Sequence, residues 1–399
     1  MPADAAAGAE LAEVWAGYLA AAERERRAGE TRSERDFPHF TEGGSWRLLG
    51  IDRRSAWRQD VYDHGNWTAG FWYGVMWLLA AGSGDGRAAG LARSRLPLLA
   101  TRAGDWTTHD LGFLFFPGFV LGRQAGLLPD HEDGPARQAA RTLAGRFNPR
   151  GHYLQAFGPV GDPRSAGTST IDTMMNLPLL WWAAGHGEDP GLLAAARCHA
   201  RTSARLFVRP DGTTFHLLRF DPVSGAVLDR GTFQGATDTS CWSRGQAWAA
   251  CGFAWAFAVT GEPELLRAAE VTGACFFERL PPSGIPPWDF SDAAADAPRD
   301  ASAAAVGALG ALILGRVHPD PDARSRWHLT ATATLGKLGS ACLNLDGTGD
   351  GILLRSCYSK PHGLGLDGAT AWGDFYLGLA LALGVGAVAF EAVVGPAGP

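Results

Sequence analysis

Asp172 is the residue whose surroundings in the sequence best suit proton transfer. It stands in the stretch 167–178, three residues after Ser169, and its neighbours include Ile171 and Met174. A carboxylic acid among apolar side chains is desolvated, which raises its pKa and lets it give and take a proton near neutrality. The spacing of Ser169 and Asp172 is also that of a capping box, in which the carboxylate only closes a helix terminus. The stretch alone leaves both interpretations open.

The elements that must position this carboxylate are helices, because apolar and amphipathic segments alternate along the chain with helical periodicity. The apolar segments are 66–78, 109–121, 170–184, 240–259, 301–314 and 370–383, and the amphipathic ones are 11–27, 87–103, 135–147, 190–207, 262–279 and 322–342. Roughly twelve helices in six pairs predict an all-α protein, an (α/α)6 toroid with apolar helices inside and amphipathic helices outside. We expect a single domain over residues 1–399, with an irregular loop at about 32–65 and a short β-hairpin insertion at about 212–235.

In such a ring the inner helices run in the same direction, so their N-termini meet at one mouth. Helix capping explains Asp, Ser and Thr at these starts, but it does not explain tryptophans there. It also does not explain Arg244 in a first helical turn, where the helix dipole disfavours a cation. A guanidinium in that place needs a carboxylate partner, either an internal Asp or an acid group of the substrate. The tryptophans are Trp67, Trp242, Trp248 and Trp372.

Composition limits the class of partner. The chain has 399 residues, of which 46% are hydrophobic and 19% charged, and it contains 15 Trp, which favours surfaces that stack on sugar rings. A net charge of −6 argues against nucleic acid or an anionic membrane as partner, because both require a basic surface.

The cysteines and the N-terminal sequence bear on compartment and cofactors. Six cysteines lie scattered without Cys-x-x-Cys spacing, so neither a disulfide framework nor a metal cluster is indicated. No secretory signal or membrane-spanning run is evident, which predicts a cytoplasmic protein. No metal site and no nucleotide-binding loop is recognisable, so we expect chemistry without a metal or cofactor.

Taken together, the inner helix starts resemble those of the unsaturated glucuronyl hydrolases, glycoside hydrolase family 88. The similar stretches occur in order and span about the whole barrel; they are residues 67–72, 109–113, 169–178, 214–216, 220–222, 242–248, 300–302 and 372–376. The resemblance implies an enzyme that hydrates the 4,5-double bond of the unsaturated uronic acid at the non-reducing end of lyase-generated glycosaminoglycan fragments of chondroitin, hyaluronan or heparin type.

The resemblance also implies roles for single residues. Asp172 matches the family's general acid and base, and Asp110 matches the aspartate that assists it. The expected substrate-binding residues are Trp67, His216, Gln234, Arg244 and Trp248. Ser356, Ser359 and Lys360 resemble, with different spacing, a cluster that some members use for a sulfate group. The alternative for that cluster is a solvated loop.

Two other functions remain open at this point. The first is another (α/α)6 enzyme, either an unsaturated rhamnogalacturonyl hydrolase or an ordinary glycosidase. The second is a non-catalytic carbohydrate-binding protein that kept only the aromatic surface, although such a protein would not need both Asp110 and Asp172. We expect a monomer or a homodimer.

Overall fold

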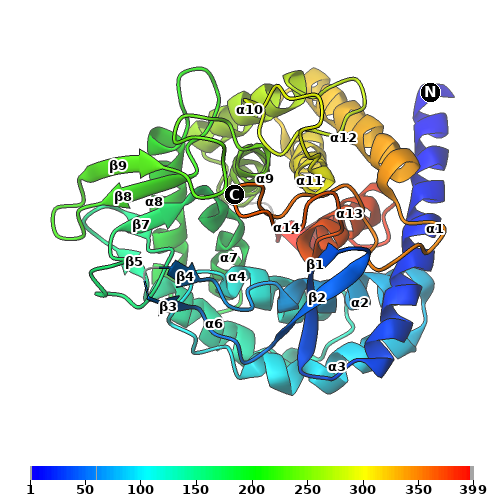
Figure 1. Ribbon diagram of the computed structural model, residues 1–399, viewed down its shortest axis with the longest axis horizontal. Coiled ribbons are helices and arrows are strands. Elements are labelled where there is room, and N and C mark those ends of the chain that lie inside the picture. The colour runs from blue at the N-terminus through cyan, green and yellow to red at the C-terminus, as the bar shows by residue number, and fades with distance from the viewer. Residues whose placement is uncertain (1, 60, 396–399) are drawn as a thin grey trace.

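The computed structural model describes residues 2–59 and 61–395, and these form two concentric rings of helices (Figure 1). The inner ring consists of α2 (Ala69–Ser83), α4 (Leu111–Phe115) with a π-helix (Phe116–Val120) and α5 (Leu121–Gln124), α7 (Leu177–Gly185), α9 (Ser243–Thr260), α11 (Ala301–Val317) and α13 (Ala371–Gly384). The outer ring consists of α1 (Pro2–Thr31), α3 (Gly86–Ala100), α6 (Gly134–Ala144), α8 (Pro190–Leu206), α10 (Pro263–Glu278) and α12 (Pro321–Cys342). The predicted (α/α)6 toroid is confirmed. A short helix, α14 (Phe390–Val394), ends the described chain.

The inner helices are buried on nearly all sides, as their continuous apolar sequences predict. Small residues let them approach closely: a Cβ added to Gly310 of α11 would lie 2.8 Å from the Cα of Cys251 in α9. The outer helices turn one apolar face inward and one polar face to solvent. None of the described helices has the length and apolar character that a membrane crossing requires.

The prediction of an irregular loop at 32–65 is wrong, because this segment contains two β-hairpins. One joins β1 (Asp36–Glu42) to β2 (Ser45–Gly50), and the other joins β3 (Ala56–Arg58) to β4 (Val61–Asp63). The first turn uses Gly43 and Gly44, whose φ angles of 58° and 78° suit a two-residue hairpin. Buried Phe37 of β1 stacks on Tyr73 of α2, which fixes this hairpin against the inner ring.

The predicted hairpin at 212–235 is present, with shorter strands than expected and with a third strand beside it. Strands β8 (Leu217–Phe220) and β9 (Val227–Gly231) pair antiparallel, and β7 (Thr168–Thr170) pairs with β8 (Figure 1). The chain passes directly from β7 into the turn that carries Asp172. The Ile171 amide donates to the His216 carbonyl at 3.0 Å, so the sheet holds this turn in place. The remaining strands, β5 (Phe147–Asn148) and β6 (Tyr153–Leu154), form a separate small hairpin.

Candidate active site

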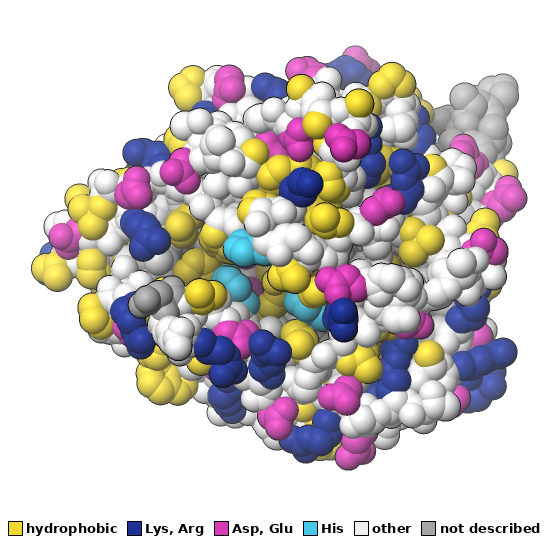
Figure 2. Space-filling view, viewed as in Figure 1, with side chains coloured by type: hydrophobic (Ala, Val, Ile, Leu, Met, Phe, Trp, Pro, Cys, Tyr) yellow, Lys and Arg dark blue, Asp and Glu magenta, His cyan; other side chains and the backbone are white. Residues whose placement is uncertain are grey.

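A pocket opens at the mouth where the inner helices begin, and Figure 2 shows this face with histidine side chains in its hollow. Most of the predicted site residues line this pocket: Trp67, Asp110, Asp172, Gln234, Arg244 and Trp248. The pocket is also lined by residues for which the sequence predicted no site role: His64, His109, Phe113, Phe157, Phe233, Trp242 and Tyr358. Of these, Trp242 was recognised only as a tryptophan at the mouth. The convergence predicted from helix direction therefore brings residues far apart in sequence to one place.

Asp172 lies in a 3₁₀ turn (Ile171–Met175) and not in the single helix predicted for 170–184. Pro178 stands in the first turn of the following helix α7, where proline favours a helix start. The capping box is not formed: Thr170 occupies the N-cap position, and Ser169 belongs to strand β7. In the described chain the Asp172 Oδ1 atom has no hydrogen-bond partner. Burial raises the pKa of Asp172, with the neighbouring Asp110 carboxylate adding to the rise and His109 opposing it.

Asp110 is placed by the residues just before α4. The Thr108 hydroxyl donates to Asp110 Oδ2 at 2.6 Å and accepts from the Asp110 amide at 3.1 Å. The carboxyl is buried, and burial raises its pKa to about 7, although the Thr108 hydrogen bond favours the ionised form. Two acids with raised pKa values therefore face the same pocket, which is the arrangement that acid and base chemistry near neutrality needs.

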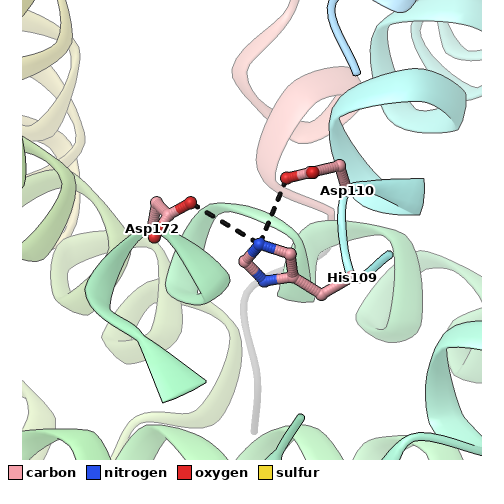
Figure 3. A group of neighbouring side chains, drawn as sticks. All are labelled: His109, Asp110 and Asp172. Carbon is pink, nitrogen blue, oxygen red and sulfur yellow. Dashed lines mark ion pairs between the residues drawn. The ribbon is translucent and has the colours of Figure 1, made fainter. Parts of the chain in front are cut away.

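His109 lies between these two acids (Figure 3). Its Nε2 atom is 3.3 Å from Asp110 Oδ1 and 3.7 Å from Asp172 Oδ2. Burial lowers the pKa of His109 to about 4, so the ring is neutral at neutral pH. The sequence contained no spacing signal for this role, because the contact joins residues that are 63 positions apart. Only the fold brings His109 and Asp172 together.

Arg244, in the first turn of α9, has the internal carboxylate partner that was one of the two predicted possibilities. It donates to Asp300 Oδ2 at 2.5 Å, to the Tyr358 carbonyl at 2.6 Å and to the Cys357 carbonyl. Its guanidinium lies 4.6 Å from the ring centre of Trp242. These bonds use three of its five N–H groups. Within the described residues the other two have no acceptor, so Arg244 can bind an acid in the pocket as well.

Aromatic side chains form much of the pocket wall. Trp67 stacks on Trp372 with ring centres 5.0 Å apart, and Trp248 packs against Phe113 at 5.5 Å. Gln234 donates from Nε2 to the Tyr358 carbonyl at 3.3 Å, which anchors the loop before α13 at the mouth. Flat apolar rings beside hydrogen-bonding groups are the usual composition of a sugar site.

The comparisons with known proteins agree with this geometry. No family model matches the chain. An unsaturated glucuronyl hydrolase from Bacillus sp. (strain GL1) is 33% identical over 353 residues, which cover 85% of this chain and 88% of that protein. The chain belongs to the unsaturated glucuronyl hydrolase family. It is therefore a glycoside hydrolase. An unsaturated chondroitin disaccharide hydrolase from Streptococcus pyogenes serotype M1 is 32% identical over 323 residues, 79% of this chain and 80% of that one.

The fold of this hydrolase is similar to a solved structure as well. The crystal structure of the unsaturated glucuronyl hydrolase from Bacillus sp. GL1, described as responsible for the degradation of glycosaminoglycan, superimposes with a TM-score of 0.82. The two chains are 30% identical, and the match covers 94% of this chain and 96% of the other. The likeness thus extends over the whole barrel.

Some predicted binding residues of the hydrolase do not line this pocket. His216 is buried behind it, with its ring 4.3 Å from that of Phe233 and 4.5 Å from that of Trp242. Ser356 is buried, Ser359 contacts His362 at 2.7 Å, and Lys360 is exposed to solvent. The predicted contacts of these four residues with substrate therefore stay predictions.

The central cluster is also the one group of described residues whose spacing would suit a metal ion. One ligand atom each of His109, Asp110 and Asp172 lie within 4.8 Å of one another. Imidazole nitrogen and carboxylate oxygen are ligands that suit several divalent cations. Nε2 of His109 already lies 3.3 Å and 3.7 Å from the two carboxylates without an ion between them, so we interpret the group as a proton-transfer cluster.

Proposed function

We propose that this hydrolase releases the unsaturated uronate from the non-reducing end of lyase-generated glycosaminoglycan oligosaccharides, of chondroitin, hyaluronan or heparin type, by hydrating its 4,5-double bond. The observation that carries the proposal is the Asp172 carboxyl, which faces the pocket beside Asp110 and has a pKa raised by burial. The names of the relatives support the substrate class, since they act on unsaturated glucuronyl and chondroitin disaccharide substrates.

The chemistry uses one acid twice. Protonated Asp172 donates its proton to C4 of the vinyl ether, and an oxocarbenium centre forms at C5. Ionised Asp172 then takes a proton from water while the water oxygen bonds to C5. The resulting hemiketal opens and releases the next sugar. An ionised Asp110 stabilises the positive charge at C5 and keeps the pKa of Asp172 high.

The pocket wall supplies recognition in this proposal. The two free N–H groups of Arg244 bind the uronate carboxylate, and Trp67 and Trp248 bind the apolar faces of the sugar rings. Gln234 hydrogen-bonds to a hydroxyl group. His216 supports this surface from behind, and Ser356, Ser359 and Lys360 remain proposed contacts for a sulfate group outside the pocket.

Two rival functions are less well supported. An inverting glycosidase separates its carboxyl groups by about 6.5–9.5 Å to fit a water molecule, whereas the cluster atoms of Asp110 and Asp172 lie within 4.8 Å. A non-catalytic sugar-binding protein would gain nothing from burying two acids at the cost of their ionisation.

The test follows the loss of ultraviolet absorbance of the conjugated uronate over a panel of unsaturated disaccharides from chondroitin, hyaluronan, heparin and rhamnogalacturonan. We expect turnover of glycosaminoglycan disaccharides and little or none of the rhamnogalacturonan disaccharide. Turnover of the latter alone would assign the chain to the rhamnogalacturonyl type. No absorbance change with any of them would contradict the proposal.

We further propose that the enzyme works in the cytoplasm, as a monomer or homodimer, without a metal or cofactor. All six cysteines are unpaired thiols, a state that a reducing compartment preserves. We expect activity to survive dialysis against EDTA, measured by the same absorbance assay. A loss that Zn²⁺ or Mn²⁺ restores would instead make the His109, Asp110 and Asp172 cluster a metal site.

A further inference from the structure

The mechanism above leaves His109 without a role, although its ring lies between both acids (Figure 3). The ring is buried, with 1% of the residue exposed. Its second nitrogen, Nδ1, lies 2.8 Å from the hydroxyl of Thr173, which belongs to the same turn as Asp172. Both ring nitrogens thus face specific partners: Nε2 faces the two carboxylates, and Nδ1 faces the Thr173 hydroxyl.

The chemistry of these partners decides which nitrogen carries the hydrogen. An ionised carboxylate can only accept, so a favourable contact with Asp110 or Asp172 requires a hydrogen on Nε2. In a neutral imidazole Nδ1 is then an acceptor, and the Thr173 hydroxyl must donate to it. The carboxylates therefore select the tautomer that presents one N–H to them, and the Thr173 hydroxyl completes it by donating to Nδ1.

Burial keeps the ring neutral. Burial lowers the pKa of His109 by more than the field of Asp172 raises it, and the field of buried Arg146 lowers it further. Three further histidines interact electrostatically with the ring, and burial lowers their pKa values as well, to about 4 or 3: His64, His199 and His216. Near neutrality, among the described residues that act on this ring, the charged groups are thus Arg146 and the ionised member of the pair Asp110 and Asp172.

We propose that His109 is a positioning residue whose single Nε2–H, oriented by Thr173, is shared between Asp110 and Asp172 so that the pair keeps one proton and one negative charge. This inference rests on the proposed function. Before turnover the shorter contact, to Asp110, stabilises the ionised form of that acid and leaves Asp172 protonated. After Asp172 has given its proton to C4, the same N–H stabilises the new carboxylate until water returns a proton. The imidazole itself gains and loses none.

The first test needs no substrate. Nitrogen-15 labelled histidine distinguishes protonated from unprotonated ring nitrogens in long-range proton–nitrogen spectra, and the signals lost in His109→Gln assign His109 among the 11 histidines. We expect hydrogen on Nε2 in the wild type and in Thr173→Val, with a shifted Nδ1 signal in the variant because that nitrogen loses its hydrogen-bond donor. Thr332→Val, which removes a hydroxyl from the distant helix α12, should leave the His109 signals unchanged. Hydrogen on Nδ1 in the wild type would overturn the inference.

The second test compares pH profiles of kcat. Asn cannot place a donor where Nε2 lies, whereas the longer Gln can. We expect His109→Asn to lower kcat about 10-fold to 100-fold, the effect of losing one hydrogen bond to a charged group. The acidic limb of its profile should move to higher pH, because ionised Asp110 loses a donor, while KM changes little. His109→Gln should regain at least part of kcat.

The two tests separate the inference from the proposed function. A wild-type pH profile in His109→Asn, or an equal loss in His109→Gln and His109→Asn, would contradict the shared N–H. If the wild type consumed no unsaturated disaccharide, the proposed function would fail, and the tautomer measured in the first test would still decide the arrangement of His109 and Thr173.

Discussion

Asp172 carries the proposed proton transfer, and the asparagine variant tests that role with almost no change of shape. We expect Asp172→Asn to fold with a melting temperature close to that of the wild type, because the neutral amide suits a buried site at least as well as a carboxylate does. Turnover should fall by about 10²-fold to 10⁴-fold, the contribution that general acid and base catalysis usually makes. The absorbance assay and a thermal melt measure both quantities. A stable variant that retained wild-type turnover would leave Asp172 without a catalytic role.

Asp110 should make the stability of the protein depend on pH. Its pKa is about 7 in the folded chain, against 3.8 for an unperturbed aspartate, so between these values the folded state holds a proton that the unfolded state has lost. Its stabilising contribution is therefore present below about pH 4 and disappears as the pH rises through about 7. We expect the free energy of unfolding of Asp110→Asn to fall less steeply than that of the wild type from pH 5 to 8. Parallel curves from urea denaturation would contradict the raised pKa.

At the level of elements, the relative position of Asp110 and Asp172 depends on how closely α4 approaches the turn before α7. A Cβ on Gly112 would lie 2.3 Å from the Cα of Asn176, and the Asn176 side chain accepts from the Phe113 amide at 2.9 Å. We expect Gly112→Ala to push these segments apart, to destabilise the protein by about 1–3 kcal/mol and to lower kcat. Thermal melts and the absorbance assay measure both effects.

Gly90 is the matched control for this substitution. It is exposed in the outer helix α3, and a Cβ there would meet no atom within 4 Å. Gly90→Ala should stabilise the protein by about 0.5–1 kcal/mol through helix propensity and leave kcat unchanged. Equal effects of the two substitutions would show that the close approach at Gly112 has no consequence for the site.

The helices and strands also show which parts of the fold could be predicted from the sequence. Continuous apolar segments predicted the inner helices and hence the mouth, because burial on all sides leaves a clear pattern. The hairpins within 32–65 were missed, although the Gly43 and Gly44 pair is a hairpin signal, because the flanking strands alternate poorly. The Asp172 turn was mistaken for a longer helix, since a 3₁₀ turn and an α-helix share nearly the same apolar spacing.

At the scale of the whole molecule, the site exists only because six helix starts meet. Asp110, Asp172 and Arg244 could be predicted as neighbours from ring closure alone. The contact of His109 with both acids could not, because it depends on side-chain directions at α4 and at the turn beside it. The internal pairing of Arg244 with Asp300 likewise joins α9 to the start of α11. Such contacts between elements carry no periodic signal.

Turnover in deuterated water tests the whole assembly, because it reports which ring carbon receives the proton. The Asp172 proton exchanges with solvent between turnovers, so hydration should place one deuterium at C4 of the released uronate. Cleavage by an ordinary glycosidase protonates the leaving oxygen and places none there.

The measurement must allow for exchange without the enzyme. In the product, C4 lies beside a ketone, so its hydrogens exchange slowly with solvent without catalysis. The measurement therefore needs early time points by NMR and a control in which product formed in ordinary water is incubated with enzyme in deuterated water. Deuterium at C4 no higher than in this control would contradict hydration. It would indicate that Asp110 and Asp172 catalyse ordinary glycosidic cleavage instead.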